Sequence, residues 1–337
     1  MTYLFVGLSV LVAIPALVAF AAWRLIVWSP GDRRRRPPAP LGEEALQVRA
    51  ALQYELTELA EEIGIRDVAT RYEQLVAAAE LIERSLSAAG YEPRRLHLDD
   101  EAAAVEKPVW NLEVEVRGRD LADEILVVGA HYDTIPESPG ANDNGSAVVA
   151  ALALARAFVD RQPRRTIRFV FFVNEESPYY MTDAMGSLRY AEDCRRRGEH
   201  VAGMICLETI GYQSTAPGSQ RYPARWIEYL YPTTGDFITV VGNIASRRLV
   251  HDVVRGLRRA SFPTEGIAAP RLLKDIFRSD HAGFWKCGYP ALMITDTANF
   301  RYPHYHTPED TVDKIDFDWL TRLVLALRDC LVTMTEA

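Results

Sequence analysis

The feature that most constrains the fold of this chain is a repeated alternation of short apolar runs with helical patterns. Apolar runs bounded by turn residues indicate strands, and continuous ones indicate strands buried on both faces. The strands are expected at 112–116 (a half-buried, alternating run), 125–128, 167–173, 203–207, 237–242 and 290–295, and the helices at 52–63, 75–86 (ended by Gly90), 146–158, 247–260 and 317–334. Strands alternating with helices predict an α/β domain with a mostly parallel central sheet and helices on both faces.

The N-terminal residues differ in kind from the rest. The stretch from Tyr3 to Trp23 carries no charge and is long enough to span a bilayer as a helix. It lacks the basic start and the small-residue cleavage site of a signal peptide, which favours an uncleaved anchor. The sequence therefore predicts a transmembrane anchor over 1–28, a basic, proline-rich linker over 29–42 and one folded domain over 43–337.

Four arginines, Arg33 to Arg36, follow the apolar run, and no Lys or Arg precedes it. The positive-inside rule then places the folded domain of this single-pass membrane protein on the cytoplasmic side.

Charge and cysteine content exclude other classes. The net charge of −8 and the lack of a basic stripe give no reason to expect a nucleic-acid partner. The four cysteines form no CxxC pair, so neither a thiolate zinc cluster nor a disulfide framework is expected. The oligomeric state is left open.

Acidic and histidine residues collect at the ends of the predicted strands, where open α/β sheets bind their ligands. They are His131 and Asp133 after the 125–128 strand, Asp143 in a Gly- and Asn-rich loop before the next helix, Glu175 and Glu176 after the 167–173 strand, Glu208 after the 203–207 strand and His306 after the last strand. Each residue alone has an ordinary explanation, such as a helix cap or a surface turn. Their convergence at one edge of the sheet predicts a site.

The residue types indicate a metal. Two imidazoles and three carboxylates without a thiolate suit zinc, although manganese or cobalt could be accommodated. Five protein ligands are too many for one catalytic zinc, which needs an open position, but they suit two ions if one carboxylate bridges them. The predicted ligands are His131, Asp143, Glu176, Glu208 and His306.

Seven short motifs then occur in a specific order, at 131–133, 140–145, 174–176, 186–187, 207–208, 279–281 and 306–311. In this order they resemble the di-zinc aminopeptidases, whose relatives include glutamate carboxypeptidase and glutaminyl cyclase. The resemblance runs over roughly Leu46 to Leu331.

The resemblance implies a zinc-exopeptidase fold, two zinc ions and a peptide substrate. The activity that it implies is hydrolysis of peptide bonds by an aminopeptidase. It implies that Asp143 bridges the ions, that His131 and Glu208 complete one of them, and that Glu176 and His306 complete the other. It also implies that Glu175 is the general base, that Asp133 orients His131, and that Tyr305 stabilises the oxyanion. Members of the family are often exported, which favours a domain outside the cytoplasm. The positive-inside rule favours the cytoplasmic side, so the side of the membrane is left open.

Two departures from the family pattern stand out. Position 208 is Glu where the best-known aminopeptidases carry Asp, which puts the geometry and metal preference there in doubt. The stretch 177–185, with Tyr179 and Tyr180, is a candidate lining for the substrate pocket and leaves the specificity open. His281 and His304 are candidates for a substrate or supporting role.

Three other functions compete with the hydrolase. A glutaminyl-cyclase-like acyltransferase would use a single zinc. A membrane protein without catalytic activity could use the same fold. A serine hydrolase would need a Gly-x-Ser-x-Gly elbow, which this sequence lacks.

Overall fold

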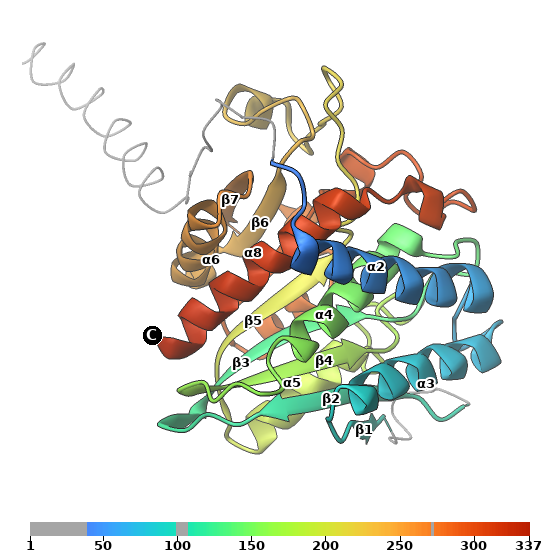
Figure 1. Ribbon diagram of the computed structural model, residues 1–337, viewed down its shortest axis with the longest axis vertical. Coiled ribbons are helices and arrows are strands. Elements are labelled where there is room, and N and C mark those ends of the chain that lie inside the picture. Colours follow the sequence, from blue (N-terminus) through green and yellow to red (C-terminus); the bar gives the residue numbers. More distant parts are fainter. Residues whose placement is uncertain (1–38, 99–106, 271–272) are drawn as a thin grey trace, which may run out of the picture.

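The computed structural model describes residues 39–98, 107–270 and 273–337. The strands that it describes form one sheet in the order β1-β2-β4-β3-β5-β8-β6-β7 (Figure 1). They are β1 (Arg94–His97), β2 (Trp110–Val116), β3 (Leu121–His131), β4 (Arg165–Phe172), β5 (His200–Glu208), β6 (Ile238–Asn243), β7 (Thr264–Ala269) and β8 (Ala291–Thr295).

The sheet is mixed rather than mostly parallel throughout. Its centre, β4-β3-β5-β8, is parallel, as predicted, and β6 and β7 are parallel to each other. However, β2 is antiparallel to both β1 and β4, and β6 is antiparallel to β8. An apolar run reports burial and not direction, so the outer strands could not be oriented from the sequence.

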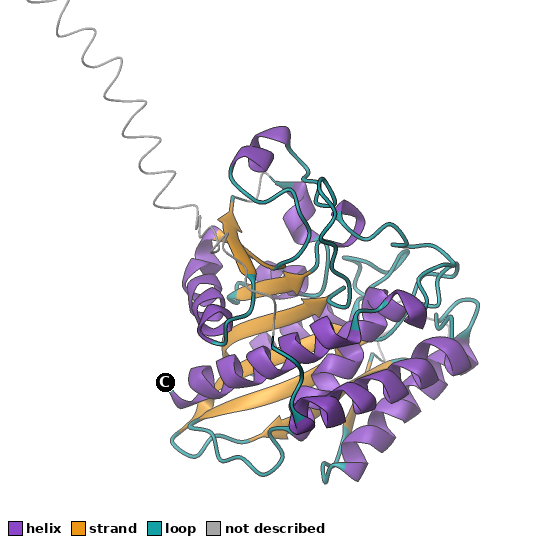
Figure 2. Ribbon diagram, turned by 45° about the horizontal axis from the view of Figure 1, so that its top comes forward, coloured by secondary structure: helices purple, strands orange, loops and turns teal. Residues whose placement is uncertain are grey.

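Helices cover both faces of the sheet, as expected (Figures 1 and 2). One face carries α2 (Glu43–Thr57) with its π-helical continuation (Glu58–Ile63), α3 (Tyr72–Ala88), α4 (Ser146–Arg156), α6 (Arg247–Arg259) and α8 (Phe317–Glu336). The other face carries α5 (Gly186–Arg196) and α7 (His281–Lys286). The elements β1, β7, α5 and α7 were not predicted.

Two apolar cores meet at the central strands. Val128 of β3 belongs to the core under α4 and α8, whereas its neighbour Val127 belongs to the core under α5 and α7. Successive strand residues point to opposite faces, so a strand covered on both sides needs apolar residues at every position. This explains the unbroken apolar run that predicted β3.

The strand predicted at 112–116 is present as part of β2, but the prediction that it is half-buried is wrong. Of the residues of β2, only Glu115 is exposed. The polar residues Asn111 and Glu113 of β2 are buried against α5: Tyr190 of α5 donates a hydrogen bond to Glu113, and Asn111 donates one to the carbonyl of Gly186. Hydrogen bonding within the protein offsets the cost of burying these polar groups.

The predicted anchor over 1–28 and most of the predicted linker lie outside the described residues. Within residues 39–98, 107–270 and 273–337, no helix combines the length and apolar character that crossing a bilayer requires.

Candidate metal centre

The carboxyl ends of neighbouring parallel strands bring the predicted ligands together. His131 is the last residue of β3 and Glu208 the last of β5, and these two strands are paired. Glu175 and Glu176 follow the end of β4, on the other side of β3. Because the strands run in the same direction, their ends meet at one edge of the sheet.

Asp143 lies between the two histidines. It sits in a π-helical turn (Ala141–Gly145) that leads into α4, and it is 3% exposed. Its Oδ1 is 3.5 Å from Nε2 of His131, and its Oδ2 is 2.9 Å from Nε2 of His306. One carboxylate therefore turns a different oxygen toward each imidazole.

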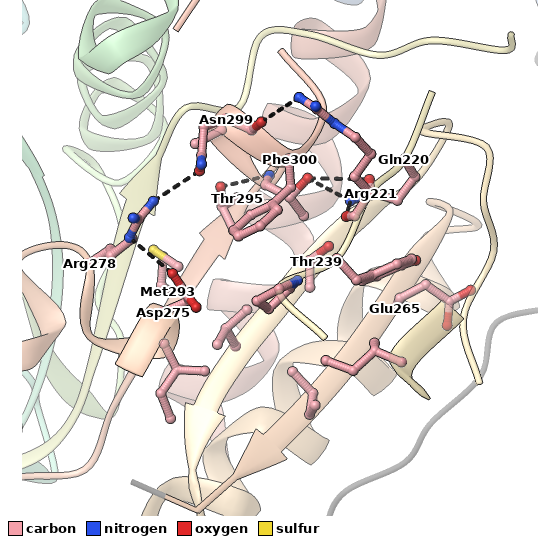
Figure 3. A pocket seen from close by; sticks show the side chains of 18 of the residues that line it. Gln220, Arg221, Thr239, Glu265, Asp275, Arg278, Met293, Thr295, Asn299 and Phe300 are labelled. Atoms are coloured by element: carbon pink, nitrogen blue, oxygen red, sulfur yellow. Dashed lines mark hydrogen bonds and ion pairs between the residues drawn. The ribbon is translucent and has the colours of Figure 1, made fainter. Parts of the chain in front are cut away.

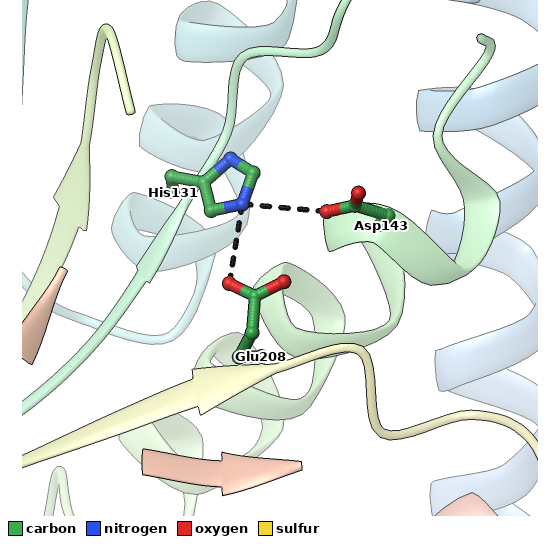
Figure 4. A group of neighbouring side chains, drawn as sticks. All are labelled: His131, Asp143 and Glu208. Carbon is green, nitrogen blue, oxygen red and sulfur yellow. Dashed lines mark ion pairs between the residues drawn. The ribbon is translucent and has the colours of Figure 1, made fainter. Parts of the chain in front are cut away.

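Two groups of potential ligands share this carboxylate. In the first, Nε2 of His131 is also 3.3 Å from Oε2 of Glu208 (Figure 4). In the second, Nε2 of His306 is 3.3 Å from Oε1 of Glu176. Within each group the candidate ligand atoms all lie within 4.8 Å of one another. The five residues predicted as ligands are thus adjacent in space.

Glu175 lies close to the same centre. Its Oε2 is 3.7 Å from Nε2 of His131, and the ligand atoms of His131, Glu175 and Glu176 also lie within 4.8 Å of one another. Distance alone therefore does not separate Glu175 from the ligands.

Several of these atoms are buried without a hydrogen-bond partner among the described residues. They are Nε2 of His131, Oδ2 of Asp143, Oε1 of Glu176 and Nε2 of His306. Buried polar atoms are normally hydrogen-bonded, whereas these approach one another at ion-pair distances without a hydrogen bond. A set of donors aimed at common points in this way fits a cation. The donor set, nitrogen and oxygen without sulfur, fits zinc.

Burial shapes the protonation of the cluster. It raises the pKa of Glu175 well above its usual range and that of Glu208 to about 8. Burial alone would also raise the pKa of Asp143, but the facing imidazoles of His131 and His306 outweigh it and lower that pKa. Burial would lower the pKa of His306, but contact with Asp143 and Glu176 raises it to about 10. Carboxylates this crowded are stabilised by a cation.

Asp133 holds the site together in two ways. The backbone oxygen of Asp133 is 3.1 Å from Nδ1 of His131, and Oδ1 of Asp133 is 3.6 Å from the same nitrogen. Its carboxylate accepts hydrogen bonds from the backbone amides of Glu175 (3.1 Å) and Glu176 (3.0 Å). The residue predicted only to orient His131 therefore also fixes the backbone that carries both glutamates.

Two supporting residues escaped prediction. The carboxylate of Asp310 accepts hydrogen bonds from the amides of Asn142 (2.8 Å) and Asp143 (3.1 Å), which fixes the Asp143 turn. Ser279 donates a hydrogen bond of 2.6 Å to Oε2 of Glu208. Both residues lie in motifs that the sequence singled out, but spacing along a chain does not reveal which atom a side chain contacts.

Two histidines considered for the site lie apart from the metal groups. His281 is buried, with Nε2 2.7 Å from the carbonyl oxygen of Ile276 and its ring against Trp285. Burial lowers its pKa to about 4, so it is a neutral core residue. His304 packs edge-on against Tyr302.

A pocket opens beside the cluster. Tyr305, whose ring stacks on His306 at 3.9 Å, lines it together with Glu208. Its wall is mainly apolar and includes Phe237, Val241 and Ile267. Met293 also belongs to this wall (Figure 3).

The rim of this pocket is polar. Asn299 accepts a hydrogen bond from Arg221 with its backbone oxygen and one from Arg278 with its side chain. Tyr179 and Tyr180, predicted as possible lining, are not part of this pocket, which is built by the β6, β7 and β8 strands and their loops.

Known proteins resemble this chain in sequence and in fold. The sequence profile of Peptidase family M28 matches residues 111–330. The chain is 37% identical over 209 residues to "Uncharacterized protein YfbL" of Escherichia coli (strain K12), covering 59% of this chain and 64% of that protein. It is 28% identical over 209 residues to "Probable leucine aminopeptidase 1" of Trichophyton verrucosum, covering 58% of this chain and 50% of that protein. The chain thus spans between half and two thirds of the length of these relatives.

Solved structures share the fold. BSAP, a zinc aminopeptidase from Bacillus subtilis, superimposes with a TM-score of 0.63 at 15% identity, covering 86% of this chain and 95% of that one. Fimbriiglobus ruber glutaminyl cyclase superimposes with a TM-score of 0.59 at 18% identity, covering 89% of this chain and 99% of that one.

Proposed function

Since the chain belongs to peptidase family M28, we propose that it hydrolyses peptide bonds as a zinc-dependent aminopeptidase. The observation that carries the proposal is the position of Asp143, whose two oxygens face two separate groups of ligands. The aminopeptidase class is supported by the Trichophyton relative, which is named a probable leucine aminopeptidase, and by the Bacillus protein, which is a zinc aminopeptidase.

Two zinc ions fit the two groups. His131, Asp143 and Glu208 would hold one, and Asp143, Glu176 and His306 the other. When bound, zinc supplies Lewis acidity that polarises the substrate carbonyl and lowers the pKa of a coordinated water. The remaining chemistry belongs to side chains of the protein.

Glu175 is proposed as the proton carrier. Its amide is held by Asp133, its carboxylate lies beside the ligand cluster, and burial raises its pKa, which favours acceptance of a proton. It takes a proton from the attacking water and returns it to the leaving amine.

Tyr305 is proposed to stabilise the oxyanion. Burial raises the pKa of its phenol well above the usual range, so the hydroxyl stays protonated at neutral pH. A protonated hydroxyl in the lining of the pocket can donate a hydrogen bond to the oxygen that gains charge in the transition state.

The pocket beside Glu208 and Tyr305 is proposed to bind the side chain of the substrate residue next to the cleaved bond. Its apolar walls favour a large aliphatic or aromatic side chain, because burying such a group releases apolar surface from water.

A chelation experiment tests the metal proposal. The full-length protein should lose aminoacyl-peptide hydrolysis when a chelator removes zinc and recover it when zinc is restored, because the ligand set alone leaves the carbonyl unpolarised. Elemental analysis of the active protein should find two zinc ions per chain. Full activity in a metal-free preparation would refute the proposal.

The zinc content, together with an assay for cyclisation, also distinguishes the hydrolase from the main alternative function. Cyclisation of N-terminal glutamine with one zinc per chain would favour a glutaminyl-cyclase-like acyltransferase, whose fold this chain shares. The presence of His131, paired in space with Glu208 and Asp143, favours the hydrolase.

A further inference from the structure

Arg66 is fully buried although it is a charged residue. It lies between the π-helical end of α2 and the start of α3, outside the residues matched by the family profile. Buried arginines are rare unless their donors are used. Here the guanidinium donates four hydrogen bonds, all to backbone carbonyl oxygens: Tyr132 (2.7 Å), Pro139 (2.6 Å), Gly140 (3.1 Å) and Gly64 (2.9 Å).

Three of these carbonyls bracket the segment that joins two ligands. Tyr132 directly follows His131, and Pro139 and Gly140 lie just before Asp143. The carbonyl of Gly140 also accepts the amide of Gly145, which closes the turn that carries Asp143. A single planar group thus ties both ends of the 132–140 segment to one point.

The backbone reinforces this connection. The amide of Arg66 donates to the hydroxyl of Thr134, and the amide of Thr134 donates to the carbonyl of Arg66, both at 3.0 Å. Gly140 has φ +64°, and a Cβ there would lie 2.4 Å from the carbonyl oxygen of Asp143. The segment is therefore held in one conformation, with little room for an alternative.

The charge of Arg66 also suits its position. Burial lowers its pKa to about 10, while Asp133, Asp310 and Asp143 oppose that shift, so the group remains a cation at neutral pH. The rigid guanidinium fork can bond several fixed carbonyls at once, which a lysine ammonium on a flexible stem cannot do equally well.

We propose that Arg66 is a positioning residue for the metal centre, which makes the N-terminal helical segment part of the functional unit. By fixing the carbonyls on either side of the 132–140 segment, it sets the separation of His131 and Asp143. This inference rests on the proposed function, because it presumes that these residues bind zinc.

The test compares Arg66→Lys and Arg66→Met with the wild type in the full-length protein. Lysine keeps the positive charge but lacks the planar guanidinium. Methionine keeps much of the side-chain volume but lacks both the charge and the guanidinium. Zinc affinity, measured by competition with a chromogenic chelator on folded protein, should fall by roughly 10- to 100-fold in both variants, as for other residues that support metal ligands.

Arg156→Met is the matched control. Arg156 makes a bidentate ion pair with Glu55 (2.7 and 2.9 Å), which joins α4 to α2 without touching the 132–140 segment. This variant should lose stability but keep its zinc affinity. Equal weakening in Arg156→Met and Arg66→Lys would show general loosening and overturn the positioning role.

If both Arg66 variants fail to fold, Thr134→Val provides the measurement, because it removes the hydroxyl that accepts the Arg66 amide. Its zinc affinity should fall by a smaller factor, and an unchanged affinity would overturn the proposal. A folded Arg66→Lys variant that binds zinc as tightly as the wild type would also overturn the proposal. A wild type that binds no zinc would instead overturn the proposed function itself.

Discussion

At the residue scale, the adjacent pair Glu175 and Glu176 presents the sharpest question. Both amides are held by Asp133, and both carboxylates are buried beside the same cluster. They differ in what they face: an oxygen of Glu176 lies 3.3 Å from His306, whereas an oxygen of Glu175 lies 3.7 Å from His131. In the proposed function, Glu176 is a metal ligand and Glu175 is the general base that carries the proton.

Two amide variants separate these roles. Glu175→Gln keeps the shape but cannot accept a proton, so zinc content should hold while kcat falls by roughly 10²–10⁴-fold. Glu176→Gln weakens a ligand, so the second ion should be lost together with activity. The measurements are zinc stoichiometry and kcat on the same preparations.

The opposite pattern would reverse the assignment. If Glu175→Gln loses zinc while Glu176→Gln keeps both ions and is only slower, Glu175 is the ligand. If neither variant changes zinc content or rate, the catalytic centre lies elsewhere.

The residues that lie together at this centre could be named from the sequence, but their contacts could not. Residues at strand ends could be named because an α/β sheet exposes those ends at one edge. Arg66, Ser279 and Asp310 could not be assigned, because each acts through a backbone group or a single oxygen far away in the chain.

At the element scale, the strands that were predicted have either a continuous apolar run or, at 112–116, a regular alternation, and the elements that were missed lack both signals. The four residues of β1 are mostly exposed and include two arginines. Helix α5 is largely polar, and α7 spans only six residues. Strand β7 contains a glycine and a buried glutamate, Glu265. Tertiary packing, rather than local pattern, forms these elements.

Strand β6 carries the prediction at this scale, through two adjacent valines. Val241 lines the pocket, whereas Val240 points into the core on the other face. Val241→Phe should fill the pocket and raise KM for leucyl and phenylalanyl substrates by roughly 10-fold or more, with little change for alanyl substrates. The measurement is kcat and KM on a series of aminoacyl amides.

The neighbouring substitution is the control. Val240→Phe overpacks the core and should lower the free energy of unfolding by about 1–3 kcal/mol without changing the order of substrate preference. If Val241→Phe weakens alanyl and leucyl substrates equally, the pocket does not bind the substrate side chain.

At the scale of the whole molecule, the proposed arrangement is a single-pass membrane protein with one peptidase domain. The uncharged stretch from Tyr3 to Trp23 supports the anchor, and α2 is the first described helix of the domain, from Glu43. Four arginines after the stretch favour a cytoplasmic domain, whereas the habit of the family favours the other side.

Membrane partitioning tests this proposal. Full-length protein should sediment with vesicles and resist extraction by high salt, because an apolar span is held by burial and not by charge. A variant lacking residues 1–38 should stay in the supernatant and remain folded by circular dichroism. Unprocessed full-length protein in the soluble fraction would contradict the anchor.

The side of the membrane needs a separate measurement. In vesicles of known orientation, a cytoplasmic domain should be digested by protease only when the cytoplasmic face is accessible. The opposite protection pattern would place the domain outside the cytoplasm.

The spread of the ligand set along the chain has a consequence for the lifetime of the protein. The proposed ligands run from His131 to His306, and they meet only at the edge of a completed sheet. An unfolded chain cannot present them together, so zinc binds the native state and draws the folding equilibrium toward it, by about 2.7 kcal/mol when free zinc is 100-fold above its dissociation constant. Zinc supply would therefore govern how much of this protein survives cellular proteolysis, as well as how fast each molecule works.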